Sequence, residues 1–98
     1  MSGTNISSAG LDPRRRRALY RAWHRGMRET DILLGKFADH ALAQMSEAEV
    51  DEFEALLDLV DRDILAWLTG EAPTPDKINT PLWKKLEQFH THGGPINV

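Results

Sequence analysis

The sequence predicts an all-α fold, a small bundle of four to five short helices. Apolar residues recur at three- and four-residue spacings in several segments, the pattern of helices with one buried face. Two of these segments follow a capping residue and a proline, and no segment keeps the alternation of a β-strand. A chain of 98 residues suits one domain with a limited core.

The first helix is predicted to begin at Asp12-Pro13, because aspartate caps free amides and proline suits the first helical position. Gly26 is expected to end this region as a left-handed stop. The apolar stripe predicted for this helix consists of Leu19, Tyr20, Trp23 and Met27.

A second helix is predicted from Glu29 or Thr30 to Gln44, with acidic residues at its positive N-terminal end. Gly35 is an unfavourable residue inside it. Its predicted buried face consists of Leu33, Leu34, Phe37, Ala38, Ala41, Leu42 and Met45.

Ser46 and Glu49 form a capping box before a third helix. The stripe that follows it consists of Val50, Phe53, Leu57, Val60 and Ile64. This helix could run unbroken to Leu68, or Asp61 could cap a short fourth helix that carries Ile64, Trp67 and Leu68. The periodicity leaves both alternatives open.

Gly70 and Pro73 end this region, and Thr80-Pro81 opens the last helix, whose apolar residues are Leu82, Trp83, Leu86 and Phe89. Gly93-Gly94-Pro95 is expected to close it. The sequence therefore divides into a disordered tail (1–11), a single helical domain (12–91) and a frayed C-terminal tail (92–98).

Composition excludes several classes of function. The chain has no cysteine, which rules out disulfides, thiolate metal sites and cysteine catalysis. No apolar run approaches the roughly 20 residues that span a bilayer, and the first residues lack the features of a secretory signal. We therefore expect a cytoplasmic protein without membrane insertion. A domain this small has little room for a cofactor pocket, so we expect it to work through its surface.

Charge is unevenly distributed along the chain. Eight Lys or Arg and three acids precede residue 37, whereas residues 37–72 contain one Arg and ten acids. The folded domain should therefore have a basic end and an acidic face, which would steer charged partners.

The junction between the first two predicted helices concentrates charge on both sides of a glycine. The planar fork of Arg25 can grip a partner's carboxylate or carbonyls, and Glu29 can cap the second helix or pair with Arg25 or Arg28. We expect Arg25 and Glu29 to be exposed charges whose removal costs little stability. Spacing alone favours a purely structural corner. The candidate partner-binding residues are Arg25, Gly26, Arg28, Glu29 and Asp31.

This stretch resembles the Arg-Gly-x-x-Glu signature of the SdhE family, also called succinate dehydrogenase assembly factor 2. The resemblance runs from about residue 15 to residue 75. It includes RGMRETD, Phe37, the Ser-capped acidic helix and Asp61-x-Asp63-Ile64-x-x-Trp67-Leu68-x-Gly70. Members of the family are five-helix proteins, which implies a helix break near Asp61.

The resemblance implies a chaperone-like factor rather than an enzyme. Such proteins bind the flavoprotein subunit of succinate dehydrogenase, and in some bacteria that of fumarate reductase, and promote covalent attachment of FAD to a histidine of that subunit. Arg25, Gly26 and Glu29 match the motif and would form the client-facing corner. We expect a monomer with no tightly bound flavin and no nucleic-acid partner.

Other residues offer weaker alternatives. Arg14 to Arg17 could bind phosphate, which would make the chain a nucleic-acid or antitoxin-like module. A solvated helix start is the simpler interpretation, and these arginines have no evident stabilising role. His90 and His92, on a predicted tail, lack a third metal ligand. His24 and His40 are expected to be ordinary surface histidines. Trp67 and Trp83 lie on apolar stripes and are expected to be buried in the core.

Overall fold

The computed structural model describes residues 10–92, of which the side chains of residues 91 and 92 are left out of the description. Most of the two predicted tails lies outside this range. The described part contains α-helices and one short 3-10 helix, and no strand. In chain order they are α1 (Pro13–Trp23), α2 (Arg28–Ala41), η2 (Leu42–Gln44), α3 (Glu47–Leu57), α4 (Asp61–Leu68) and α5 (Pro81–His92).

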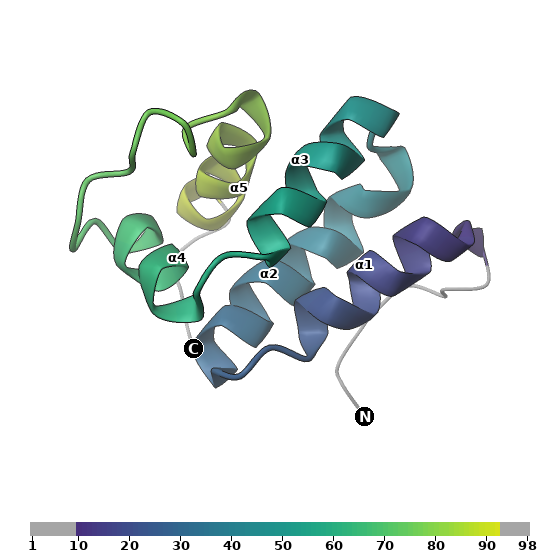
Figure 1. The fold of residues 1–98 in the computed structure, drawn as a ribbon, viewed down its shortest axis with the longest axis horizontal. Coiled ribbons are helices and arrows are strands. Elements are labelled where there is room, and N and C mark those ends of the chain that lie inside the picture. The colour runs from purple at the N-terminus through teal and green to yellow at the C-terminus, as the bar shows by residue number, and fades with distance from the viewer. Residues whose placement is uncertain (1–9, 93–98) are drawn as a thin grey trace.

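Helix α2 lies at the centre of the arrangement (Figure 1). It contacts α1 along one side and α4 and α5 on the other, while α3 contacts both α1 and α5. The predicted all-α bundle is therefore confirmed. None of the helices within residues 10–92 has the length and apolar character needed to cross a bilayer.

The predicted helix starts are confirmed by their capping bonds. Asp12 Oδ1 accepts a bond from the Arg15 amide at 3.1 Å. Ser46 and Glu49 form the reciprocal capping box, at 3.1 and 3.0 Å. Thr80 Oγ1 accepts from the amide of Trp83 at 3.2 Å. Each bond satisfies an amide that the first helical turn leaves free.

The chain breaks between α3 and α4, which confirms the shorter of the two alternatives for this region. The expectation that Asp61 caps the new helix is wrong, because Val60 is the cap residue and Asp61 is the first helical residue. Val60 was predicted to be part of the buried stripe, but it is 63% exposed, since the turn carries it away from the core.

The end of α1 also differs from prediction. Helix α1 ends at Trp23 with His24 as its C-cap, and Gly26 does not have a positive φ. Among the described residues only Gly70 has one, at 82°. Tyr20, predicted on the buried stripe, is 63% exposed, because Ala18, Leu19 and Ala22 form the buried face. Helix α2 begins at Arg28, one residue before the earlier of the two predicted starts, and ends at Ala41, while η2 completes the segment to Gln44.

The core is formed by apolar side chains from all five α-helices. Trp83 is completely buried, as predicted. Trp67 is only partly buried and presents its ring edge to Trp83, with 6.0 Å between ring centroids, so the prediction of a buried Trp67 is wrong. Leu11, the last residue of the predicted N-terminal tail, is buried.

Gly35 marks the closest approach of α1 to α2. A Cβ atom added to Gly35 would lie 2.3 Å from Cδ2 of Trp23, well inside van der Waals contact. Glycine has a low helix propensity, but the packing of the Trp23 indole ring on the α2 backbone requires it at position 35.

Candidate functional site

The linker between α1 and α2 holds the predicted corner, and its arginine points inward. The side chain of Arg25 is only 9% exposed. Its guanidinium donates to the carbonyl oxygens of Leu57 at 2.8 Å and Leu59 at 2.6 Å, and it forms an ion pair with Asp61. The expectation that Arg25 is an exposed charge is wrong, because its fork grips carbonyls of its own chain.

Two carboxylates complete this arrangement. Asp61, 17% exposed, bonds to the Arg25 guanidinium and accepts from the amide of Gly26 at 3.0 Å. Asp31, on the first turn of α2, accepts from the amide of Arg25 at 2.5 Å. The corner is thereby tied both to α2 and to the α3–α4 turn, so its backbone is fixed before any partner arrives.

The other two charges of the motif face outward. Arg28 is exposed and Glu29 is half-buried, both in the first turn of α2. Within residues 10–92 neither side chain makes a hydrogen bond or ion pair. The expectation that Glu29 caps α2 or pairs with Arg25 or Arg28 is wrong, because Met27 occupies the cap position without a side-chain bond. Both charges are free to meet a partner.

Gly26 lies exposed between the inward and outward groups. A Cβ added to it would lie 3.4 Å from Asp61 Oδ2, which is ordinary van der Waals contact. The fold of the chain therefore does not require glycine at this position, in contrast to Gly35.

A shallow hollow of about 430 Å³ opens beside the corner, at the end of α1. Tyr20 and His24 form its rim and are stacked, with 3.9 Å between ring centroids. Sequence reasoning missed Tyr20 because its spacing matched the buried stripe. It also missed Asp61 as a corner residue, although the Asp61-x-Asp63 pattern drew attention to that segment. The hollow is lined by Tyr20, Arg21, His24, Arg25, Gly26, Leu57 and Asp61.

Two of the four consecutive arginines of α1 form ion pairs within the protein. Arg14 pairs with Glu47 at 3.1 Å, with Glu54 at 2.8 Å and with Asp51. Its hydrogen bonds hold the pKa of Glu54 below the usual value. These contacts correct the expectation that the arginines have no stabilising role, because they join α1 to the acidic helix α3.

Arg15 acts in the same way. It pairs with Glu47 at 3.2 Å and donates to the carbonyl of Met45 at 2.6 Å. Arg16 donates to the carbonyl of Leu11 at 3.2 Å, and Arg17 is exposed. A phosphate-binding patch built on Arg14 to Arg17 would therefore compete with three acidic side chains for Arg14 alone.

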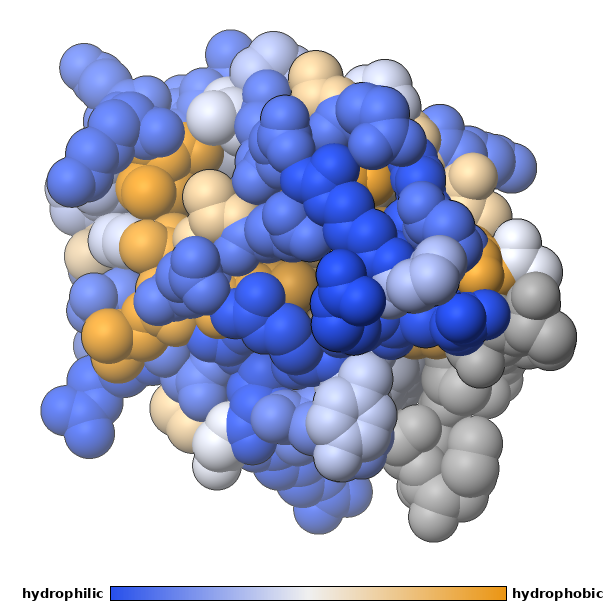
Figure 2. All heavy atoms as spheres, turned by 45° about the vertical axis from the view of Figure 1, so that its right-hand side comes forward, coloured by the Kyte–Doolittle hydropathy of each residue, from blue (hydrophilic) through white to orange (hydrophobic). Residues whose placement is uncertain are grey.

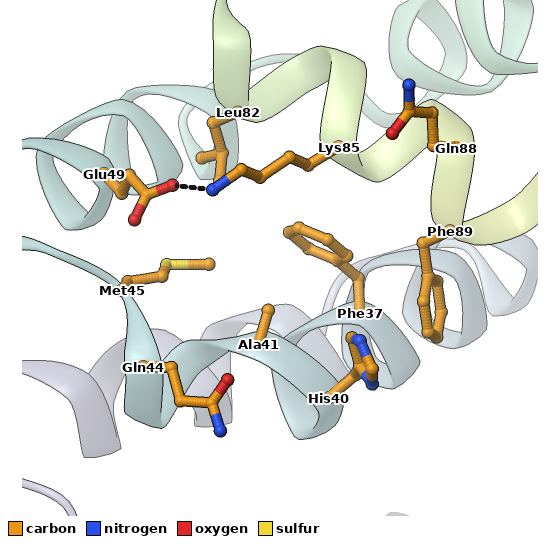
Figure 3. Close-up of a pocket in the computed structure, with 10 residues that line it drawn as sticks. All are labelled: Phe37, His40, Ala41, Gln44, Met45, Glu49, Leu82, Lys85, Gln88 and Phe89. Carbon is orange, nitrogen blue, oxygen red and sulfur yellow. Dashed lines mark hydrogen bonds and ion pairs between the residues drawn. The ribbon is translucent and has the colours of Figure 1, made fainter.

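A second hollow, of about 420 Å³, lies between α2, η2 and α5 (Figure 3). Phe37 and Phe89 line one end of it, and the Lys85–Glu49 ion pair, at 2.6 Å, crosses the other. His40 packs against Phe89 with 4.9 Å between ring centroids. This hollow lies away from the motif, and none of the five predicted site residues lines it.

The histidines do not form a metal site among the side chains that the structure describes. His90 is not on a tail, because α5 runs to His92. Its Nε2 is 2.8 Å from the carbonyl of Leu33, and burial lowers its pKa. The side chain of His92 is outside the described part, and His24 is exposed, as predicted.

Comparison with known proteins gives a consistent result. The family model Sdh5, described as flavinator of succinate dehydrogenase, matches residues 16–90. The FAD assembly factor SdhE of Acetobacter pasteurianus is 35% identical over 85 residues, which make up 87% of this chain and 78% of that protein. The mitochondrial succinate dehydrogenase assembly factor 2 of Saccharomyces cerevisiae is 42% identical over 83 residues.

The yeast alignment covers 81% of this chain and 51% of the relative, so the chain spans about half the length of the yeast proteins that it matches. The mitochondrial assembly factor of Dictyostelium discoideum is 33% identical over 92 residues, which are 94% of this chain and 64% of that relative. The resemblance inferred from the motif is thus confirmed across the whole helical domain. The chain belongs to the family of flavinators of succinate dehydrogenase.

Proposed function

We propose that this protein binds the flavoprotein subunit of succinate dehydrogenase and promotes covalent attachment of FAD to it. The observation that carries this proposal is the family match over residues 16–90, which includes the whole α1–α2 corner. The relative from Acetobacter pasteurianus bears the name FAD assembly factor. The fold adds a rigid corner that presents unpaired charges.

The corner supports a binding role rather than a catalytic one. Arg25 and Asp31 are engaged within the chain, whereas Arg28 and Glu29 project opposite charges from one helical turn. Such a pair can contact a partner surface of mixed charge. Because the backbone that holds the pair is already ordered, binding should cost little backbone entropy. The attachment chemistry would belong to the client and its flavin, which this chain would hold in a reactive orientation.

Gly26 provides independent support for close contact at this corner. Its own fold leaves room for a side chain, since the nearest atom to an added Cβ is 3.4 Å away. A glycine that the chain does not need for itself is well suited to let a partner backbone approach. Larger residues at position 26 should therefore impair binding before they impair folding.

We propose that the protein acts as a monomer in the cytoplasm, holds no flavin of its own and has no enzymatic activity. The flavoprotein subunit of fumarate reductase would be a second client, to which FAD is attached in the same way. Purified protein should be colourless, and a stoichiometric yellow chromophore that survives gel filtration would overturn the statement about flavin.

The test is covalent flavin on the client. Cells that lack their own assembly factor would express the client with this chain, and in-gel fluorescence would measure covalent flavin. The wild-type chain should restore it, and the Arg28→Ala, Glu29→Ala double variant should reduce it by about tenfold or more, since interface charges lose their partners. Lys84→Ala, an exposed charge on α5, is the matched control.

Circular dichroism should show that both variants remain helical. If the wild-type chain leaves covalent flavin at the level of the empty vector, the proposed function is wrong. If the double variant restores flavin fully, the function stands but the outward charges of the corner do not carry it.

A further inference from the structure

Within the described residues, the side chains on the outer face of helix α1 bond to the rest of the fold only through the Arg16–Leu11 hydrogen bond and the exposed Arg21–Asp58 ion pair. We propose that this α1 outer face (Arg16, Arg17, Tyr20, Arg21 and His24) is a second docking surface, which binds an acidic surface segment of the client flavoprotein. The inference rests on the proposed function and extends it, because it assigns to the client a contact beyond the Arg-Gly-x-x-Glu corner.

The aromatic side chain of this face is the first observation. Tyr20 is 63% exposed, one of the two large apolar residues left exposed in the described chain. It lies flat on the ring of His24, with an angle of 18° between the ring planes, and Nδ1 of His24 is 2.8 Å from the Tyr20 carbonyl. The pair is held in place without a partner, so an incoming group would meet an ordered aromatic surface at low entropic cost.

Charge is the second observation. Helix α1 contains no acidic residue, and its inner arginines, Arg14 and Arg15, are neutralised by α3. Arg17 makes no ion pair within residues 10–92, and Arg16 bonds only to a backbone carbonyl there. The side of the molecule that carries α1 comes forward in Figure 2, where strongly hydrophilic side chains cover the centre of the face.

The acids at the border of this face are few and already engaged. Asp58 pairs with Arg21 at 2.6 Å, in a bridge whose two side chains are 44% and 72% exposed. Glu54 is held by Arg14, and Asp61 by Arg25. An exposed bridge such as the one at Arg21 is worth little, so a partner carboxylate can replace Asp58 without much loss.

Continuity with the corner is the third observation. One hollow, of about 500 Å³, lies between Pro13, Arg16, Arg17, Tyr20 and Arg21. The hollow beside the corner shares Tyr20 and Arg21 with it and reaches Gly26. The two hollows form one shallow groove along α1, from Pro13 at the start of the helix to Gly26 in the motif. An extended or helical acidic segment of the client would lie in this groove.

An acidic protein surface fits this face better than a nucleic acid does. Tyrosine and arginine, like tryptophan, are enriched among the residues that contribute most of the binding energy in protein interfaces. Backbone recognition of a duplex relies instead on many unopposed cations. Here Glu54, Asp58 and Asp61 border the face, and the whole chain carries a net charge of −3.

The experiment measures binding of the purified client subunit by isothermal titration at two salt concentrations. The variants are Tyr20→Ala and Arg17→Glu, with Tyr20→Phe as the conservative change and Lys84→Glu as the matched charge reversal on α5. Tyr20→Ala and Arg17→Glu should each weaken binding by about tenfold or more. Both control variants should bind like the wild type, and Arg17→Glu should reduce the dependence of binding on salt. Thermal unfolding should be nearly unchanged, because these side chains are exposed.

Each other outcome decides against the proposal. Wild-type affinity in both variants overturns the α1 outer face but leaves the proposed function intact. A wild-type chain that neither binds the client nor raises its covalent flavin overturns both. Salt-sensitive binding to a DNA or RNA duplex that Arg17→Glu abolishes, with client binding retained, would assign the face to nucleic acid. A concentration-dependent dimer lost in Arg17→Glu would assign it to a second copy of the chain.

Discussion

The carboxylate of Asp61 bonds to both the Arg25 guanidinium and the Gly26 amide, so one side chain of α4 fixes two adjacent residues of the α1–α2 linker. The arginine and the glycine of the motif are adjacent in sequence, but they have different roles. Arg25 joins the linker to the α3–α4 turn, whereas Gly26 remains at the surface. This separation leads to predictions in which stability and binding respond to different residues.

Arg25→Ala is expected to destabilise the fold strongly. The substitution removes the cation that Asp61 faces at 17% exposure and leaves the carbonyls of Leu57 and Leu59 without their donor. Breaking a buried pair costs about 3–5 kcal/mol, although the partial exposure of Asp61 should place the loss near the lower end. Urea denaturation measures it. Arg28→Ala, at an exposed position, is the control, with a loss within about 1 kcal/mol.

An Arg25→Ala variant as stable as Arg28→Ala would contradict the inward position of Arg25. The same comparison bears on functional assays. Loss of client flavinylation in Arg25→Ala would reflect a disordered corner as much as a lost contact, so Arg28 and Glu29 are the better residues to test for direct binding.

Gly35→Ala is expected to destabilise the protein, whereas Gly26→Ala is not. The added methyl at position 35 would overlap the Trp23 ring, with the nearest atoms at 2.3–2.7 Å, and would push α1 away from α2. Overpacking of this kind costs about 1–3 kcal/mol. Thermal unfolding of the two variants side by side is the measurement, and equal melting temperatures would refute the close approach.

The two tryptophans of α4 and α5 should differ in importance. Trp83 is fully buried, so Trp83→Ala should cost about 3–5 kcal/mol. Trp67 packs on its edge and keeps contact with solvent, so Trp67→Ala should cost clearly less. Chemical denaturation gives both values, and a larger loss for Trp67 would reverse the burial order that the structure shows.

Glu54 should make stability depend on acid pH. Because bonding to Arg14 lowers its pKa in the folded state, its contribution is complete above the unfolded value of 4.5 and is lost as pH falls through the lower folded value. Melting temperatures of the wild type and Glu54→Gln should therefore differ most near neutral pH and converge in acid. Ala55→Gln, at an exposed neighbouring position, controls for the change of α3. A difference that grows as pH falls would contradict the pairing.

The sequence predicts the helices well because their signals are local. Asp12, Ser46 and Thr80 cap the helices as expected, since each needs only the three residues that follow it. The break before Asp61 could not be chosen from periodicity, because Leu57 and Ile64 fit both one helix and two. The resemblance to a five-helix family favoured the correct alternative.

The direction of each corner side chain could not be predicted. Arg25 meets Asp61 across 36 residues of sequence, and a motif contains no information about which distant carboxylate reaches it. The prediction that Tyr20 is buried was wrong for a related reason. Residues spaced by three and four cover a wider stripe of α1 than the face that packs against α2 and α3. Gly35 appeared unfavourable because propensity describes the isolated helix, whereas the Trp23 ring decides its value in the fold.

The pairing of Arg14 and Arg15 with α3 has a consequence for the order of folding. Their acidic partners follow 32 to 40 residues later, so the α1–α2 hairpin can form first with its positive charge unopposed. The anionic third helix is then drawn to a cationic template over a distance greater than side-chain contact. Docking of α3 should therefore slow as ionic strength rises, even where the finished bridges add little to the final stability.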